Sequence, residues 1–125
     1  MTVLVDSDIL IEVSRGRNEE VIAKWMELSN SAAAVLYSPI SAAELWAGAL
    51  PREQEALADL FGAITCTEIN ERTGRQAGTF INRYRRSHGV ELADALIAAG
   101  AIANRAKLWT RNRQHYPMRE VAFFE

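Results

Sequence analysis

The N-terminal stretch Val3–Asp8 (VLVDSD) constrains the fold more than any other part of the chain. Three apolar, mostly β-branched residues followed at once by acids are typical of a buried strand that ends at the edge of a sheet. Ligands of open α/β sheets bind beyond the carboxyl ends of the strands, which is where Asp6 is predicted to lie. Two nearby carboxylates repel each other and favour a cation between them. Alternatively, Ser7 or Asp8 simply caps the next helix, and this stretch alone leaves both interpretations open.

The rest of the chain alternates short apolar runs with helical patterns. Alternation of this kind predicts an α/β fold with a mainly parallel sheet of about five strands. We expect strands over residues 2–6, 33–37, 63–66, 107–110 and 120–124. We expect helices over 9–15, from a cap at Asn18, over 41–50, over 51–62, from a cap at Thr67 to Gly89, and over 91–104. Trp25, Leu45 and Trp46 are predicted core residues.

Length and composition limit the class of protein. The chain has 125 residues, a common size for one domain, and we expect a single domain over residues 1–125. Its one cysteine, Cys66, excludes a disulfide within the chain and a CxxC metal site. We expect no signal peptide and no membrane-spanning segment. The net charge of −2 means that nucleic-acid binding would need a local basic patch.

Two further acids stand in predicted helices. Glu44 follows Ser41 with the spacing of a capping box, in which each side chain would satisfy a backbone amide. Small apolar neighbours would instead bring Glu44 toward a strand end as a partly buried acid. Asp94 lies in a first helical turn, where the helix dipole favours a carboxylate. Flanking alanines would let this helix end pack close to the sheet and turn Asp94 inward. The local sequence therefore leaves both a structural and a functional role possible for Glu44 and for Asp94.

The segment after the fourth predicted strand, Thr110–His115 (TRNRQH), carries a third group of polar residues. Thr110 and Asn112 could form a local turn or donate hydrogen bonds to a carboxylate. His115 is a weak metal candidate, because a lone loop histidine is more often a surface residue.

Taken together, these pieces resemble the PIN-domain ribonucleases, specifically the VapC-type toxins of bacterial type II toxin–antitoxin pairs. VDSDIL resembles the strand that delivers the family's first metal-site acid, here Asp6. SAAELWAGA and ELADALIAAGAIA resemble the helices that carry the second and third acids, here Glu44 and Asp94. LWTRNRQHY resembles the family's T-x-N stretch. Many members have a fourth Asp where this chain has His115, so the remaining contact would fall to Asn112 or Asp8, with Thr110 as a further supporting residue.

The resemblance implies a three-layer α/β/α PIN-like domain and a metal-dependent endoribonuclease that uses Mg²⁺ or Mn²⁺. Asp6, Glu44 and Asp94 would be catalytic, with Asp6 and Asp94 as metal ligands and Glu44 as a ligand or as the group that orients the attacking water. Such a site would hydrolyse RNA phosphodiester bonds by in-line attack of water. The resemblance also implies an antitoxin partner, a homodimer and a cytoplasmic location.

Arginines near the same sheet edge are the expected RNA contacts. Phosphates are bound by such side chains, and bare carboxylates alone would repel RNA. The candidates are Arg15, Arg17, Arg111 and Arg113. For Arg83, Arg85, Arg86 and Arg105 we expect solvated helix faces.

Two alternative functions are compatible with parts of the pattern. Asp6-Ser7-Asp8 satisfies the D-x-D signature of haloacid-dehalogenase-type phosphatases, in which Asp6 would be the nucleophile and Asp8 the general acid. That class also needs a late acidic pair after a strand, and this chain has none. A second alternative is a PIN-like interaction module that has lost catalysis because His115 replaces an acid.

Overall fold

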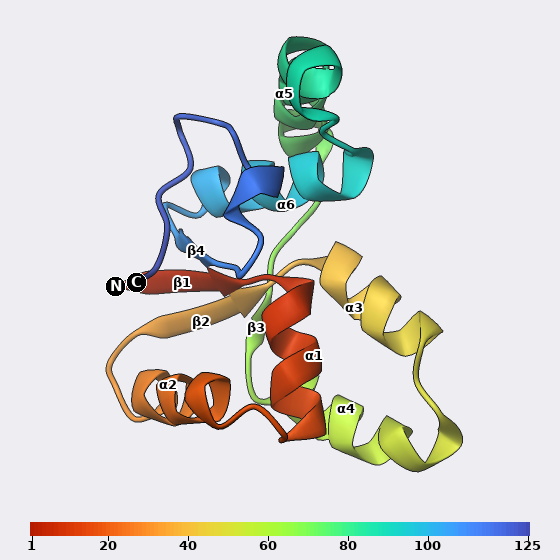
Figure 1. Ribbon diagram of the computed structural model, residues 1–125, viewed down its shortest axis with the longest axis vertical. Helices are drawn as coiled ribbons and strands as arrows, with labels where there is room; N and C mark the ends of the chain where they lie inside the picture. Colours follow the sequence, from red (N-terminus) through yellow and green to blue (C-terminus); the bar gives the residue numbers. More distant parts are fainter.

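A computed structural model describes all 125 residues (Figure 1). Its centre is a parallel sheet of four strands in the order β3-β2-β1-β4. The strands are β1 (Thr2–Val5), β2 (Ala34–Tyr37), β3 (Thr65–Cys66) and β4 (Lys107–Trp109). Strand β1 pairs with β2 on one side and with β4 on the other, so the carboxyl ends of the first and last strands lie side by side.

Six α-helices surround this sheet. They are α1 (Ser7–Arg15), α2 (Glu19–Ser29), α3 (Pro39–Ala47), α4 (Gln54–Gly62), α5 (Glu71–His88) and α6 (Leu92–Ala103). Two short 3₁₀ helices, η1 (Pro51–Glu53) and η2 (Arg113–His115), complete the chain. None of the helices is long and apolar enough to cross a membrane.

The two faces of β1 pack into separate hydrophobic clusters, which produces the three-layer arrangement. Leu4 belongs to a cluster with residues of α5 and α6, above the sheet in Figure 1. Val3 and Val5 belong to a cluster with residues of α1, α2, α3 and α4, on the other face. Because both faces are covered, β1 reads as an unbroken apolar run, as a buried parallel strand should. The α/β class, the parallel sheet and the three layers are confirmed.

The predicted fifth strand over residues 120–124 is wrong, and the sheet has four strands. Only one isolated parallel bridge forms, between Leu108 and Phe123. Strand β4 is three residues long, and Leu108 supplies both of its hydrogen bonds to this segment, from Leu108 N–H to Ala122 O and from Phe124 N–H to Leu108 O. The segment therefore lies beside β4 without becoming a strand.

Two local predictions are also wrong. Helix α5 is capped by Asn70, whose side chain accepts from Thr73 N–H, and not by Thr67. Thr67 instead continues the edge of the sheet, since its backbone N–H donates to Tyr37 O. Trp46 is 41% exposed, whereas Leu45 is buried and Trp25 is partly buried as predicted.

Candidate active site

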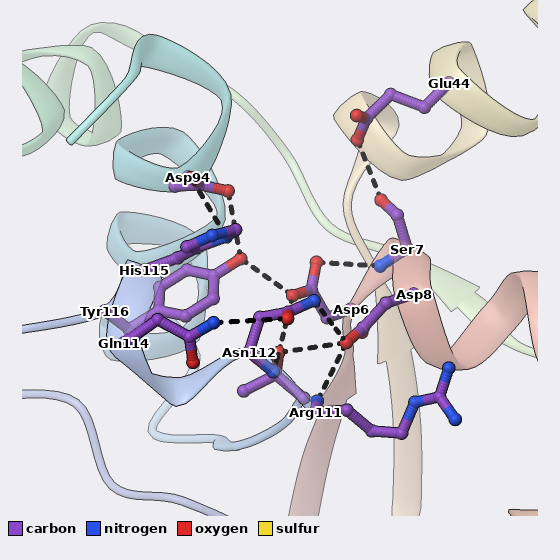
Figure 2. Close-up of polar contacts among 11 residues, drawn as sticks. Asp6, Ser7, Asp8, Glu44, Asp94, Arg111, Asn112, Gln114, His115 and Tyr116 are labelled. Atoms are coloured by element: carbon purple, nitrogen blue, oxygen red, sulfur yellow. Dashed lines mark hydrogen bonds and ion pairs between the residues drawn. The ribbon is translucent and has the colours of Figure 1, made fainter. Parts of the chain in front are cut away.

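Asp6 lies at the carboxyl end of the central strand, is buried, and accepts three hydrogen bonds (Figure 2). Its Oδ1 accepts from Ser7 N–H at 2.7 Å, so Asp6, and not Ser7 or Asp8, is the N-cap of α1. Its Oδ2 accepts from Thr110 Oγ at 2.8 Å and from Tyr116 OH at 2.9 Å. Because β4 ends beside β1, Thr110 can donate this hydrogen bond to Asp6, which is one of the two roles that the sequence allowed for Thr110.

The position of Asp6 is electrostatically costly. Burial raises the pKa of Asp6 to about 6, and the nearby charge of Asp8 adds to this effect. The hydrogen bonds from Thr110, Tyr116 and Ser7 act in the opposite direction because they favour the ionised form. A carboxyl held in this state gains stability from any cation that approaches it.

Tyr116 is the main site residue that the sequence did not reveal. Its buried hydroxyl donates to Asp6 Oδ2 and also lies 3.4 Å from Asp94 Oδ1, so it joins the two acids. Burial and the charges of Asp6 and Asp94 raise the pKa of Tyr116 well above its ordinary value, which keeps the hydroxyl protonated as a donor. The only signal in the sequence is its place shortly after the Thr110–Asn112 stretch.

Asp94 lies in the first turn of α6 and faces Asp6 across Tyr116 (Figure 2). Its Oδ2 lies 3.8 Å from Nδ1 of His115, the residue in the place of a fourth acid. Burial raises the pKa of Asp94, while His115 and Tyr116 partly offset the rise. His115 therefore contacts the acid site with an imidazole where an acid would have added a further negative charge.

Asp8 holds the loop after β4 in place. Its Oδ1 accepts from Ile9 N–H at 2.8 Å, and its Oδ2 accepts from Arg111 N–H at 2.8 Å and from Asn112 Nδ2 at 3.0 Å. Asn112 thus contacts Asp8 and has no hydrogen bond to Asp6 or Asp94. Because Asp8 is fully engaged as an acceptor, the geometry gives it no role as the general acid of a D-x-D phosphatase.

Glu44 lies on the other side of the site, on α3 (Figure 2). The capping-box interpretation is wrong, because Ser38 caps α3 and accepts from Ile40 N–H at 3.1 Å. Ser41 is buried within the helix, and Ser7 Oγ lies 2.8 Å from both Ser41 Oγ and Glu44 Oε1. Ser7 is therefore a second site residue that was missed, since the sequence suggested only a helix cap.

The acids are arranged as a linked row and not as a closed cluster. Asp6 and Asp94 share Tyr116, while Glu44 is connected to the Asp6 end of α1 through Ser7. No three His, Cys, Asp or Glu side chains lie close enough together to hold one metal ion as they stand. The structure thus brings Asp6 and Asp94 together through Tyr116, while Glu44 has no hydrogen bond to either acid, although its charge contributes to the raised pKa of Asp94.

The four candidate arginines divide into two pairs. Arg111 and Arg113 follow β4, but their side chains point away from Asp6 and Asp94: Arg111 lies 3.8 Å from Glu12, Arg113 lies 3.3 Å from Glu125, and both line a surface hollow beside α2. Arg15 and Arg17 lie at the far end of α1, about 13 Å along the helix from Asp6. Arg15 nevertheless lines the same surface hollow as Glu44, between α1, α3 and α4.

Comparison with known proteins relates this geometry to one family. The family model described as PIN domain matches residues 3–123. The chain is 36% identical over 116 residues to Ribonuclease VapC19 of Mycobacterium tuberculosis, and the match covers 92% of each chain. It is also 36% identical over 121 residues to Ribonuclease VapC10 of the same organism, covering 94% of this chain and 88% of that protein.

Solved structures share the fold over nearly the whole chain. VapBC2 from Rickettsia felis, bound to a DNA fragment from its promoter, has a TM-score of 0.83 at 18% identity and covers 99% of this chain and 98% of that one. VapBC-1 from nontypeable Haemophilus influenzae has a TM-score of 0.81 at 21% identity and covers 100% and 98%. These likenesses show the arrangement of strands and helices.

Proposed function

Because this chain belongs to the PIN-domain family, we propose that it is an endoribonuclease and acts as the toxin of a toxin–antitoxin pair. One observation carries the proposal above the others. A buried acid, Asp6, ends the central strand and is joined through Tyr116 to Asp94, in a chain 36% identical to curated VapC ribonucleases.

Asp6 and Asp94 are the residues that would hold a divalent cation, Mg²⁺ or Mn²⁺. Carboxylate oxygens are the ligands that hard cations prefer, and Mg²⁺ is commonly held by one or two carboxylates together with substrate phosphates. Burial raises the pKa of both acids, a cost that a cation would offset. Oδ1 of Asp6 would have more capacity for a cation than Oδ2, since Oδ1 accepts only from Ser7 N–H whereas Oδ2 accepts from both Thr110 and Tyr116.

The bound cation supplies positive charge that stabilises the phosphodiester as negative charge develops on it. This chain's own residues would orient the reactants. Tyr116 and Thr110 fix the carboxylate of Asp6, and Ser7 fixes Glu44, which would orient the attacking water. Arg111 and Arg113, in the segment after β4, would bind phosphates of the RNA that extend past the acids, with Arg15 and Arg17 as further contacts beyond α1.

The proposal extends to partners. The family implies a cognate antitoxin that binds the toxin, and a homodimer of this chain as one PIN domain over residues 1–125. A cytoplasmic location, which the family resemblance implies, is part of the same proposal.

The test is RNA cleavage by the purified protein with Mg²⁺ or Mn²⁺, and with excess EDTA. We expect cleavage only with the cation, and its loss in Asp6→Asn and in Asp94→Asn. Asp59→Asn, which removes an exposed acid on α4, is the matched control and should cleave normally. Equal cleavage in EDTA would contradict the metal role, and full activity in Asp6→Asn would contradict the site. A folded protein that neither binds Mn²⁺ nor cleaves RNA would be an interaction module, while release of phosphate from an aryl phosphate would indicate the phosphatase.

A further inference from the structure

Helix α5 carries a line of arginines along one face. Positions 72, 75, 79, 83 and 86 recur every three or four residues and therefore stack along one side of an α-helix. Arginine occupies four of them, Arg72, Arg75, Arg83 and Arg86, and Thr79 occupies the fifth. We call these four arginines the α5 ridge. It extends about 21 Å along the helix axis and contains no acid.

The α5 ridge faces solvent. All four arginines are exposed, whereas the opposite side of the helix is buried through Thr73, Ala77 and Phe80. Helix α5 lies farther from the sheet than α6, with which it packs, so the ridge is on an outer surface of the molecule (Figure 1). The helix has five arginines and one acid in a chain of net charge −2, so positive charge is concentrated here.

Internal ion pairs do not account for this charge. Arg72 and Arg86 have no ion-pair partner. Arg75 pairs with Glu71 at 2.9 Å, with both side chains more than three-quarters exposed, and Arg83 pairs with Glu120 at 3.3 Å. Exposed pairs of this kind contribute about 0 to 1 kcal/mol to stability, so a phosphate can replace either acid.

The α5 ridge also has a defined place relative to the acids. Arg86 lies in the last turn of α5, and residues 89–91 connect it to α6, whose first turn carries Asp94. One end of the ridge is therefore a short connection away from the site, and the other end is near Arg105, which lines a surface hollow together with Arg72. An RNA strand that crosses the acids must pass an otherwise acidic protein, and this line of guanidinium groups offers it a positive path.

We propose that the α5 ridge binds the phosphate backbone of the substrate RNA beyond the cleaved bond. This inference rests on the proposed ribonuclease function and deepens it. Guanidinium groups bind phosphate oxygens through paired hydrogen bonds and stay charged at all relevant pH values. Backbone contacts of this kind hold the RNA in register over the acids and read no bases.

The experiment compares two double variants. Arg72→Gln with Arg86→Gln removes the two unpaired charges of the ridge, and Lys107→Gln with Arg119→Gln removes two exposed charges elsewhere. Glutamine has a helix propensity similar to that of arginine, so α5 should remain folded. Binding of a single-stranded RNA of about 20 nucleotides is followed by fluorescence anisotropy in EDTA over a range of salt concentrations. Each lost phosphate contact lowers the salt slope by about 0.7, so we expect the ridge variant to lose about 1.4 and the control variant to keep the wild-type slope.

The possible outcomes distinguish a failure of the RNA-binding role of the α5 ridge from a failure of the proposed ribonuclease function. With Mg²⁺ or Mn²⁺, the ridge variant should cleave an RNA of about four nucleotides at the wild-type rate, yet show a raised KM for the long RNA. An unchanged salt slope, or an equal loss in the control variant, would overturn the role of the ridge even if the protein cleaves RNA. A weaker affinity for duplex DNA with unchanged RNA binding would also overturn it, because the ridge would then serve another nucleic acid. Failure of the wild-type protein to cleave any RNA would instead contradict the proposed function.

Discussion

The buried carboxyl of Asp6 makes a testable link between stability and function. Burial raises the pKa of Asp6 from its ordinary value of 3.8 to about 6, so the folded protein binds this proton more tightly than the unfolded chain does. Ionisation of Asp6 above pH 6 therefore lowers the free energy of unfolding, by about 3 kcal/mol for this difference in pKa. Asp6→Asn removes that cost and keeps an acceptor for Thr110 and Tyr116, but the amide loses the hydrogen bond from Ser7 N–H, worth about 1 kcal/mol.

We therefore expect Asp6→Asn to abolish cleavage and yet raise the free energy of unfolding by about 2 kcal/mol at pH 7.5, or Tm by about 6 °C. The sign depends on pH. As pH falls through 6 toward 4, Asp6 in the folded wild type takes up its proton, so the advantage of the variant must shrink. Urea unfolding in EDTA at pH 7.5, 6 and 4.5 measures this, with the exposed Asp59→Asn as the control. No gain at pH 7.5, or a gain that does not change with pH, would refute the reasoning.

Four further predictions follow from the same contacts. Tyr116→Phe removes a hydrogen-bond donor that favours ionised Asp6, so the pKa of Asp6 should rise further and the acid limb of the pH–rate profile should move to higher pH. Mn²⁺ affinity, measured by calorimetry, should fall about tenfold or more. An acid limb that does not move would argue against this role of Tyr116. Ser7→Ala frees Glu44 and should lower kcat about fivefold, and because buried Ser41 also loses its contact with Ser7, Tm should fall by about 4 °C; steady-state kinetics and melting check the two effects. Asp8→Asn weakens its hold on the loop after β4 and should lower the free energy of unfolding by about 1 to 2 kcal/mol in urea titrations. Removing divalent cations with EDTA at pH 7.5 should lower the Tm of the wild type but leave that of Asp6→Asn unchanged.

Local sequence patterns correctly predicted the buried central strand and several helix ends. The apolar run of β1 is unbroken because neighbouring strands and both helix layers cover it, and Asn18 and Gly89 mark helix ends as the sequence predicts. Residues 120–124 carry a similar apolar pattern, but they contact β4 through the single bridge between Leu108 and Phe123 and form no strand. An apolar pattern shows that a segment can be buried beside a sheet, and it does not show that the segment makes the repeated backbone pairing of a strand.

The site residues also differ in whether the local sequence could identify them. The sequence identified Asp6, Glu44 and Asp94 as candidate site acids. The positions of Asp6 at a strand end and of Asp94 in a first helical turn are local properties, whereas Glu44 lies within α3. It could not identify Tyr116, because the hydroxyl acts on Asp6 across 110 residues and nothing in the neighbouring sequence marks that contact. The S-x-x-E spacing of Ser41 and Glu44 also allowed a capping box, and the structure excludes that alternative because the cap of α3 is the earlier Ser38.

The contacts that hold Asp6 also set when the site can form. Thr110 and Tyr116 are 104 and 110 residues later in the chain, and β4, which pairs with the central strand, begins only at Lys107. A growing polypeptide that carries Asp6, Glu44 and Asp94 but has not yet delivered Thr110 and Tyr116 from the ribosome has neither the completed sheet nor the donors that orient Asp6. We therefore expect the carboxylate of Asp6 to be oriented only after the chain as far as Tyr116 has left the ribosome.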